Sequence, residues 1–182
     1  SNTLVGMYAG TELNTGHSNT AIGNNSLYLS TNGAYNTAVG YSSLYKNTSG
    51  YYNVAVGYEA VEENQTGGEI TAVGYQALNK TTVDKGTAFG FQAGLEATSA
   101  SGVTFLGWKS GRSCTSGADN TGVGAGALEY VSTGSLNTAI GRDAGGNITT
   151  GQNCTVIGYN ATASAANASN EITLGNSSVT KL

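Results

Sequence analysis

The sequence is poorest in the residues that interrupt a regular fold or carry chemistry. It has no proline, two cysteines, one histidine and one tryptophan, and only 10% of its 182 residues are charged. Proline cannot donate to a strand ladder, so its absence suits a chain in which every strand is hydrogen-bonded. Cys114 and Cys154 form no metal or redox motif, and the sequence therefore indicates neither a metal site nor a cofactor.

The low charge also excludes several kinds of partner. The formal net charge is −4 and the seven Lys and Arg residues are scattered, whereas nucleic-acid binding normally shows a basic patch. No apolar run approaches the roughly 20 residues of a membrane-spanning helix. Disorder is not expected either, because the net charge is modest and Val, Ile, Thr and Tyr are frequent. We expect a folded chain with no nucleic-acid partner and no membrane insertion.

Glycine is abundant, and its spacing organises the whole chain. Of 28 glycines, eleven recur with a period of 17, apart from one step of 16 between Gly74 and Gly90: Gly6, Gly23, Gly40, Gly57, Gly74, Gly90, Gly107, Gly124, Gly141, Gly158 and Gly175. We call these the corner glycines and number the repeats as coils 1 to 11. The repeats predict a single domain over residues 1–182. Because the chain opens in mid-pattern, we expect a fragment of a longer fibre protein.

The residues around each corner glycine are equally regular. The third residue before it is Thr in nine of eleven coils, the third residue after it is always Ala or Ser, and a second glycine often follows at the tenth position after it. A short β-branched segment such as Thr-Ala-Val favours a strand, and each glycine suits a tight corner. Strand, corner, strand and corner at a fixed period predict an all-β parallel solenoid. Stacking at ~4.8 Å would make eleven coils a rod of roughly 50 Å.

The residue just before each corner glycine is always large and apolar: Val5, Ile22, Val39, Val56, Val73, Phe89, Leu106, Val123, Ile140, Ile157 and Leu174. We expect this column to form an inward ladder, with the Ala/Ser column filling a thin interior. The shortened repeat, between Leu78 and Gly90, is expected to lack one residue in its outer corner. A single thin roll leaves flat faces exposed, and a closed homotrimer around the rod axis would bury one of them.

The segments "NTAIG", "NTAVGYSSL", "ITAVGYQAL" and "NTAIGRDAG" resemble the head repeats of YadA-like trimeric autotransporter adhesins. The form with Tyr-Gln-Ala-Leu after the glycine looks still more like phage tail-fibre and related viral fibre proteins. The closing segment "NEITLGNSSVTKL", residues 170–182, is similar to segments that precede an endosialidase-type intramolecular chaperone domain in such fibres. The resemblance covers essentially the whole chain, although the period of 17 is longer than the usual adhesin head repeat.

The resemblance implies a left-handed β-roll, a homotrimer and an extracellular location on a virion or cell surface. The leading hypothesis is a structural tail-fibre segment that presents or forms a host-receptor-binding surface, with a surface glycan or protein as the receptor. Two alternatives remain: a bacterial trimeric adhesin head, or the subunit of a self-assembling extracellular filament.

The most suggestive candidate site is an aromatic column directly after the corner glycine of five successive coils. It contains Tyr41, Tyr58, Tyr75, Phe91 and Trp108. Stacked at the coil spacing, these rings would form either a receptor-binding strip about 19 Å long or a ladder that stabilises the roll or the interface between chains. The structural interpretation is favoured, and the receptor interpretation stays open.

Other polar columns have simpler interpretations. Asn19, Asn36, Asn53, Asn120 and Asn137 begin strands and are expected to form side-chain ladders or to bond the corner backbone rather than a ligand. The Thr column could order water on a flat face, but one Thr per strand makes a thin array. The acidic residues around Glu62 lack the spacing of a calcium loop.

We expect no enzymatic activity and no catalytic residues. "VGYQAL", residues 73–78, fits the hexapeptide motif of left-handed β-helix acyltransferases, but the motif position comes only once in each period of this chain, whereas those enzymes repeat it three times per coil. They also use a histidine beside a long loop. The only histidine here, His17, has no such loop near it, and no nucleophile–base–acid set can be assigned around it.

Overall fold

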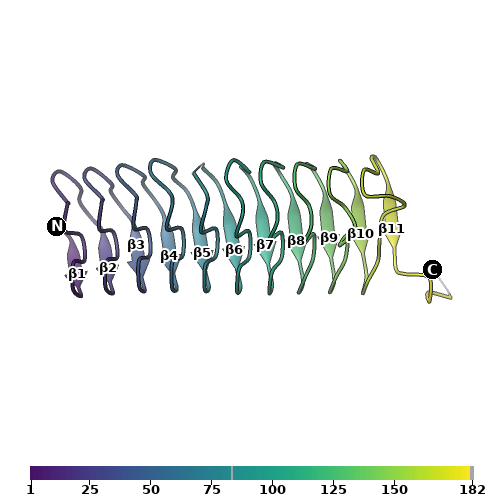
Figure 1. Cartoon of the computed structure of the whole chain (residues 1–182), viewed down its shortest axis with the longest axis horizontal. Helices are drawn as coiled ribbons and strands as arrows, with labels where there is room; N and C mark the ends of the chain where they lie inside the picture. The colour runs from purple at the N-terminus through teal and green to yellow at the C-terminus, as the bar shows by residue number, and fades with distance from the viewer. Residues whose placement is uncertain (83, 181–182) are drawn as a thin grey trace.

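The computed structural model describes residues 1–82 and 84–180, and within them the chain is a β-solenoid without helices. Eleven three-residue strands pair in chain order in one parallel sheet. The coils stack into a rod with the N-terminus at one end and the C-terminal segment at the other (Figure 1). The strands are β1 (Thr3–Val5), β2 (Thr20–Ile22), β3 (Thr37–Val39), β4 (Val54–Val56), β5 (Thr71–Val73), β6 (Thr87–Phe89), β7 (Thr104–Leu106), β8 (Thr121–Val123), β9 (Thr138–Ile140), β10 (Thr155–Ile157) and β11 (Ile172–Leu174).

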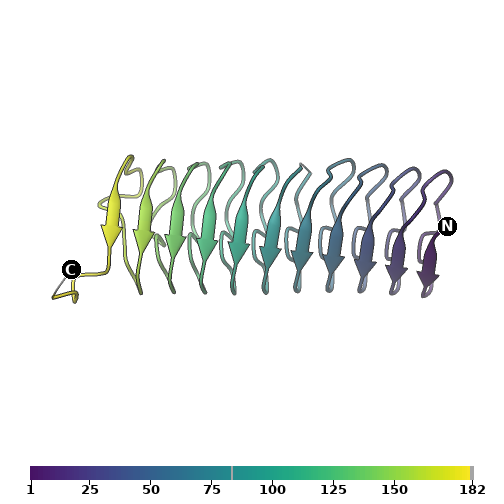
Figure 2. The same cartoon turned by 180° about the vertical axis from the view of Figure 1, so that it is seen from behind.

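The winding and the register follow the sequence period. In Figure 2 the strands lie on the near side and point downward while the chain advances from right to left, which is a left-handed coil. Thr37 pairs with Val54, a full period further on, whereas Thr71 pairs with Thr87 across the shortened step. The backbone amide of Thr82 donates to the Thr98 carbonyl in the next coil, and the backbone amide of Lys85 donates to the Gly68 carbonyl in the preceding coil. The shift in register therefore falls in the corner between Thr82 and Lys85; Val83 lies outside the described residues.

Each coil contains one strand, so the prediction of two strands per coil is wrong for the described part of the chain. The run after each corner glycine consists of turns in which alternate residues have positive φ, such as Ser42 and Leu44, both at 51°. Residues with a left-handed backbone conformation cannot continue a β-strand, but their backbone N–H groups still point along the rod axis. The Ser42 amide donates to Asn24 in the preceding coil, and the Leu44 amide donates to Ala60 in the next.

The two glycine columns meet different needs at the two corners. Gly40 and Gly57 have φ values of 133° and 138°, which only glycine adopts readily, and a Cβ there would collide with the carbonyl of the next corner glycine. At the second corner, an added Cβ on Gly50 would collide with the Gly67 carbonyl. Both columns therefore permit close backbone approach, which confirms the predicted corners.

The interior is thin, as the Ala/Ser column predicts. From Ser26 to Ala161 this column is fully buried, and it faces the central residues of β2 to β10, which are also buried and are usually Ala. The larger interior side chains come from the next position of the turn run, where Leu27, Leu44 and Leu78 are fully buried. Small residues on the strand thus accommodate large residues from the opposite side of the coil.

The predicted inward ladder of large apolar residues is wrong: the column before the corner glycine points outward. In β3 the central residue Ala38 is fully buried while Val39 is half-exposed, and in β9 the side chain of Ile140 is 42% exposed. Successive strand residues face opposite sides. Because the central Ala faces the interior, its neighbours on either side, Thr and the large apolar residue, both face out.

The Asn column is internal, and its predicted ladder is confirmed. The amide of Asn36 donates to Asn19 Oδ1 at 2.9 Å, and Asn36 Nδ2 donates to the Gly50 carbonyl at 2.8 Å. The same two contacts recur for Asn137, whose backbone amide donates to Asn120 Oδ1 and whose Nδ2 donates to the Gly151 carbonyl. A second buried pair, Asn47 and Asn64, joined at 2.9 Å, was not anticipated. Each amide satisfies backbone groups that the corners would otherwise leave unpaired.

One coil reverses the usual distribution of volume. The central residue of β7 is Phe105 instead of Ala, and the adjacent turn runs carry Gly94 and Gly111 where coils 2, 3, 5 and 8 carry Leu. A Cβ on Gly111 would overlap the Phe105 ring. One large ring from the strand therefore fills the space that two leucines from the turns occupy elsewhere, which conserves the interior volume.

Candidate interaction surfaces

The outer side of the 11-stranded sheet is a continuous weakly polar surface, which we call the sheet face. It consists of two columns: the Thr column, in which Val54 and Ile172 replace Thr, and the large apolar column before the corner glycines. Neither column contains a charged residue. Leu106 is 47% exposed, and Ile22, Phe89 and Ile157 are similarly exposed.

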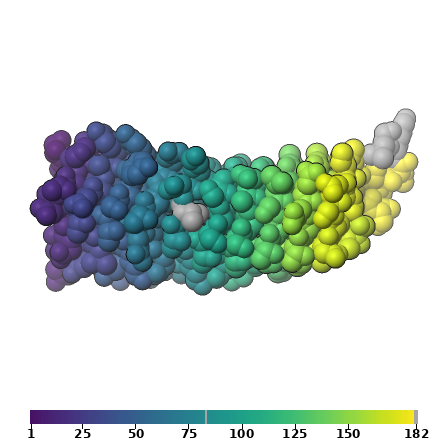
Figure 3. Space-filling model, turned by 90° about the horizontal axis from the view of Figure 1, so that it is seen from above, coloured from purple at the N-terminus to yellow at the C-terminus, as the bar shows by residue number. Residues whose placement is uncertain are grey.

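The sheet face extends along the whole rod. Its rungs repeat at the coil spacing, which gives a length of roughly 50 Å, and the view from above shows an elongated, slightly curved rod (Figure 3). Exposed apolar residues that adjoin one another over a long surface are typical of interaction surfaces, and the large apolar column provides such a run beside the Thr column. This surface was not predicted from the sequence, because the large apolar column was expected to lie in the interior.

The aromatic column lies at the corner that follows the strand. Tyr41, Tyr58, Tyr75 and Phe91 stack in sequence, with ring centroids 5.1 Å apart and planes within 11° of parallel. Trp108 does not continue this stack; Lys109 Nζ lies 4.2 Å from the centre of its ring instead. Four of the five predicted residues are thus brought together, and all five are exposed.

The stacking determines which parts of these rings a ligand could reach. Within the stack each ring covers the faces of its neighbours, so the exposed atoms are mainly ring edges and hydroxyls. Sugar rings bind aromatic side chains through the ring faces, which are available here only at the two ends of the stack. The geometry therefore favours a cross-coil ladder.

A polar ladder runs beside the aromatic stack. Gln76 Nε2 donates to Glu59 Oε2 at 2.8 Å, and Gln92 Nε2 donates to Gln76 Oε1 at 2.9 Å. Arg112 Nε extends the ladder by donating to Gln92 Oε1 at 3.2 Å. A hydrogen bond to Glu59 raises the pKa of Tyr58. These side chains satisfy one another and leave few groups free for a ligand.

The acidic stretch also resolves into separate pairs. Glu63 pairs with Lys46 at 2.6 Å, and Glu62 accepts a hydrogen bond from Asn79 at 3.1 Å. Burial raises the pKa of Glu62, and the hydrogen bond to Glu63 raises the pKa of Lys46. Across residues 1–82 and 84–180, no group of three or more His, Cys, Asp or Glu residues is placed to hold a metal ion.

The residues with nucleophilic or basic chemistry lie apart from one another. His17 is exposed at the second corner, where its ring contacts the edge of Tyr35 at a centroid distance of 5.1 Å. Cys114 and Cys154 are free and buried, and each thiol bonds a backbone carbonyl at the second corner, that of Gly117 or of Ala168. Burial raises the pKa of Cys114 to about 11, so its thiol is protonated at neutral pH.

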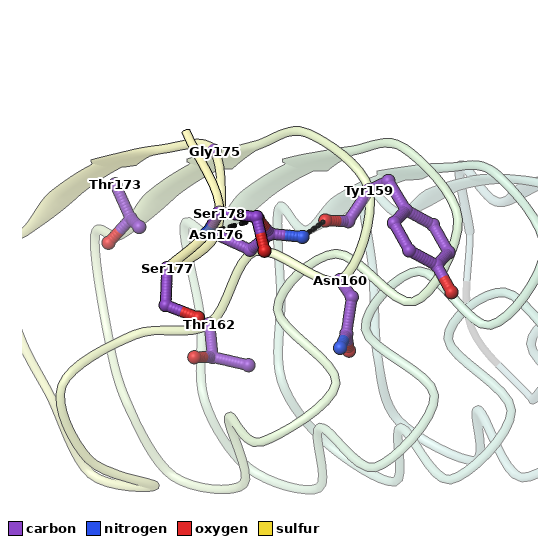
Figure 4. A pocket seen from close by; sticks show the side chains of 8 residues that line it. All are labelled: Tyr159, Asn160, Thr162, Thr173, Gly175, Asn176, Ser177 and Ser178. Atoms are coloured by element: carbon purple, nitrogen blue, oxygen red, sulfur yellow. Dashed lines mark hydrogen bonds between the residues drawn. The ribbon is translucent and has the colours of Figure 1, made fainter. Parts of the chain in front are cut away.

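A hollow lies beside the last coils, where the segment after β11 leaves the stack (Figure 4). It has a volume of about 680 Å³, and apart from Tyr159 its lining consists of amide, hydroxyl and glycine residues. Asn176 Nδ2 donates to the Tyr159 carbonyl at 2.9 Å and fixes the departing segment. A lining of this kind can bind polar groups but contains no group with acid–base function near neutral pH.

Comparison with known proteins adds no relative. No family model matches the chain, and no curated protein and no solved structure is significantly similar to it. In the part of the chain that the structure describes, no helix is long and apolar enough to cross a membrane.

Proposed function

We propose that this chain is a non-enzymatic, homotrimeric segment of an extracellular fibre, of the phage or viral tail-fibre type, that holds or forms a receptor-binding surface at a distance from its anchor. The observation that carries the proposal is the sheet face. A closed three-fold arrangement places the same long face of three rods around a common axis and removes it from water. The mechanical role follows from the ladders of backbone hydrogen bonds that join every coil to the next.

The proposal assigns different tasks to the sides of the rod. The sheet face meets the other chains, and the stacked aromatic corner stiffens each rod along its length. The turn runs lie across the interior from the strands, since Ser110 Oγ in a turn run donates to the carbonyl of Gly122 in β8 at 2.9 Å. The turn runs therefore remain available to a receptor after assembly.

The solution mass tests the proposal, and two matched variants locate the interface. Native mass spectrometry or sedimentation equilibrium is expected to give three times the chain mass of 18.3 kDa. Ile140→Glu, on the sheet face, is expected to give a folded monomer, because it would bury three charges at the axis. Leu136→Glu alters a side chain that is 55% exposed at the second corner and is expected to leave the trimer intact.

Two results would contradict the proposal. A wild-type monomer or dimer would exclude the three-fold fibre, and dissociation by Leu136→Glu but not by Ile140→Glu would place the interface elsewhere. Circular dichroism of both variants separates loss of assembly from loss of fold. A mass that grows without limit with concentration would favour the filament alternative.

A further inference from the structure

A second hollow lies over coils 8 to 10, on the turn runs. Its volume is about 330 Å³, within the usual range of small-ligand sites. It is lined by Gly126, Glu129, Tyr130, Asp143, Gly146, Asn147, Asn160 and Thr162. Asn160 and Thr162 also line the hollow of Figure 4, so the two are continuous. We call the smaller one the coil 8–10 hollow.

The coil 8–10 hollow exists because glycine replaces larger residues on its surface. Gly126 and Gly146 occupy, in their coils, the places that Gln76 and Asn79 occupy in coil 5. In coil 5 both side chains reach the preceding coil: Gln76 joins the polar ladder through Glu59, and Asn79 bonds Glu62. Without them the ladder is interrupted, and a depression opens between the polar side chains that remain.

The polar groups around the coil 8–10 hollow are largely unsatisfied by the protein. Within the described residues, the side chains of Glu129, Asn160 and Thr162 have no hydrogen-bond partner, and Asp143 pairs only with its neighbour Arg142 at 3.2 Å. Asn147 is paired, because its Nδ2 donates to the Ala163 carbonyl and its Oδ1 accepts from the Ala163 amide. The free groups are a carboxylate from coil 8 and an amide and a hydroxyl from coil 10, and the carboxylate of Asp143 lies in coil 9 between them.

The aromatic residues here differ from those of the stack. Tyr130 is 56% exposed and Tyr159, in the adjoining hollow, is 61% exposed. In the described part of the chain neither ring stacks on another aromatic ring, although the Arg142 guanidinium lies 5.8 Å from the centre of the Tyr159 ring. Both therefore offer ring surface that the stacked rings do not.

We propose that the coil 8–10 hollow binds a neutral saccharide. Its carboxylates and amide would accept and donate hydrogen bonds to sugar hydroxyls, and the face of Tyr130 would contact the apolar side of the sugar ring. The lining has two carboxylates and no cationic side chain, which disfavours anionic sugars. The site rests on the proposed function for its role as a receptor contact, but binding is measurable whatever the oligomeric state.

The test is a titration followed by ¹H–¹⁵N correlation NMR of the intact chain. The probes are methyl glycosides of glucose, galactose and N-acetylglucosamine, at concentrations up to tens of millimolar. At least one glycoside is expected to shift the amide signals of Gly126, Tyr130, Gly146 and Asn160 in a saturable manner. The proposal would be overturned if none of the three glycosides gave a saturable shift at these residues. It would also be overturned if only methylamine, a small cation that carboxylates attract, shifted these signals saturably.

Three variants sharpen the result. Tyr130→Ala is expected to weaken binding by roughly two- to tenfold, and Glu129→Gln by about tenfold. Tyr75→Ala removes a ring of the aromatic stack and is expected to leave affinity unchanged. If Tyr75→Ala weakened glycoside binding and Tyr130→Ala did not, the sugar would bind the aromatic stack, and the proposal would be contradicted. A monomeric wild-type mass with intact glycoside binding would contradict only the fibre assembly.

Discussion

The inner side of the sheet presents mainly alanine, whereas its outer side presents threonine, valine, isoleucine and leucine. In an ordinary globular domain the larger apolar residues would face inward. In this narrow coil the turn run already supplies the interior leucines, so the strand can contribute only small side chains. This difference is the observation on which the proposed assembly through the sheet face rests.

The largest expected effect comes from neighbouring residues on opposite sides of β7. Phe105→Ala would leave a cavity between Gly94 and Gly111 and is expected to lower the free energy of unfolding by about 3–5 kcal/mol. Leu106→Ala, on the outer side, is expected to cost less than about 1 kcal/mol in the monomeric Ile140→Glu background. Urea unfolding measures both free-energy changes, provided that the dependence of the unfolding free energy on urea concentration is the same in the two variants. If both substitutions lowered the free energy of unfolding equally, the inner and outer sides of β7 would not differ as described.

The next effect concerns the buried thiol of Cys114. Its pKa is about 11 in the folded chain against an ordinary value of 9.0, so the folded state holds its proton more tightly. The resulting stability is fully present below pH 9 and is lost as the pH rises from 9 to 11, by about 2–3 kcal/mol. Cys114→Ala is expected to reduce this pH dependence by that amount in urea unfolding. An unchanged pH profile would show that the thiol is not desolvated.

A smaller effect distinguishes the two sides of β5. Ala72→Leu adds volume to a filled interior and is expected to lower the free energy of unfolding by about 1–3 kcal/mol. Val73→Leu adds one methylene on the sheet face and is expected to change it by no more than about 0.5 kcal/mol in the same monomeric background. Thermal or urea denaturation decides between them. If Val73→Leu were the more costly change, the original inward assignment of this column would be correct.

The period determined most of the fold in advance. The spacing of the corner glycines was sufficient to predict the solenoid, the coil boundaries, the thin interior and the Asn ladder, because each depends on residues that recur at one position. The direction of the strand side chains could not be predicted in the same way. Val39 and Ala38 are both apolar, and only the contribution of Leu44 from across the coil determines which of them fits inside.

The interaction surfaces were less predictable from sequence. The stack of Tyr41, Tyr58 and Tyr75 was visible as a column, but its covered ring faces depend on three-dimensional spacing. The coil 8–10 hollow arises from departures from the repeat, such as Gly146, rather than from the repeat itself. Columns that change character along the rod, rather than those that persist, were the signal that could have indicated it.

The most direct test of the central claim, that chains meet through the sheet face, is photocrosslinking from matched positions. The photoreactive residue p-benzoylphenylalanine would replace Ile140 in one sample and Leu136 in another, and denaturing gels would follow irradiation. Position 140 is expected to give covalent dimers and trimers, and position 136 only monomers. Crosslinks from position 136 but not from 140, or from neither position in a protein with a trimeric mass, would contradict the claim.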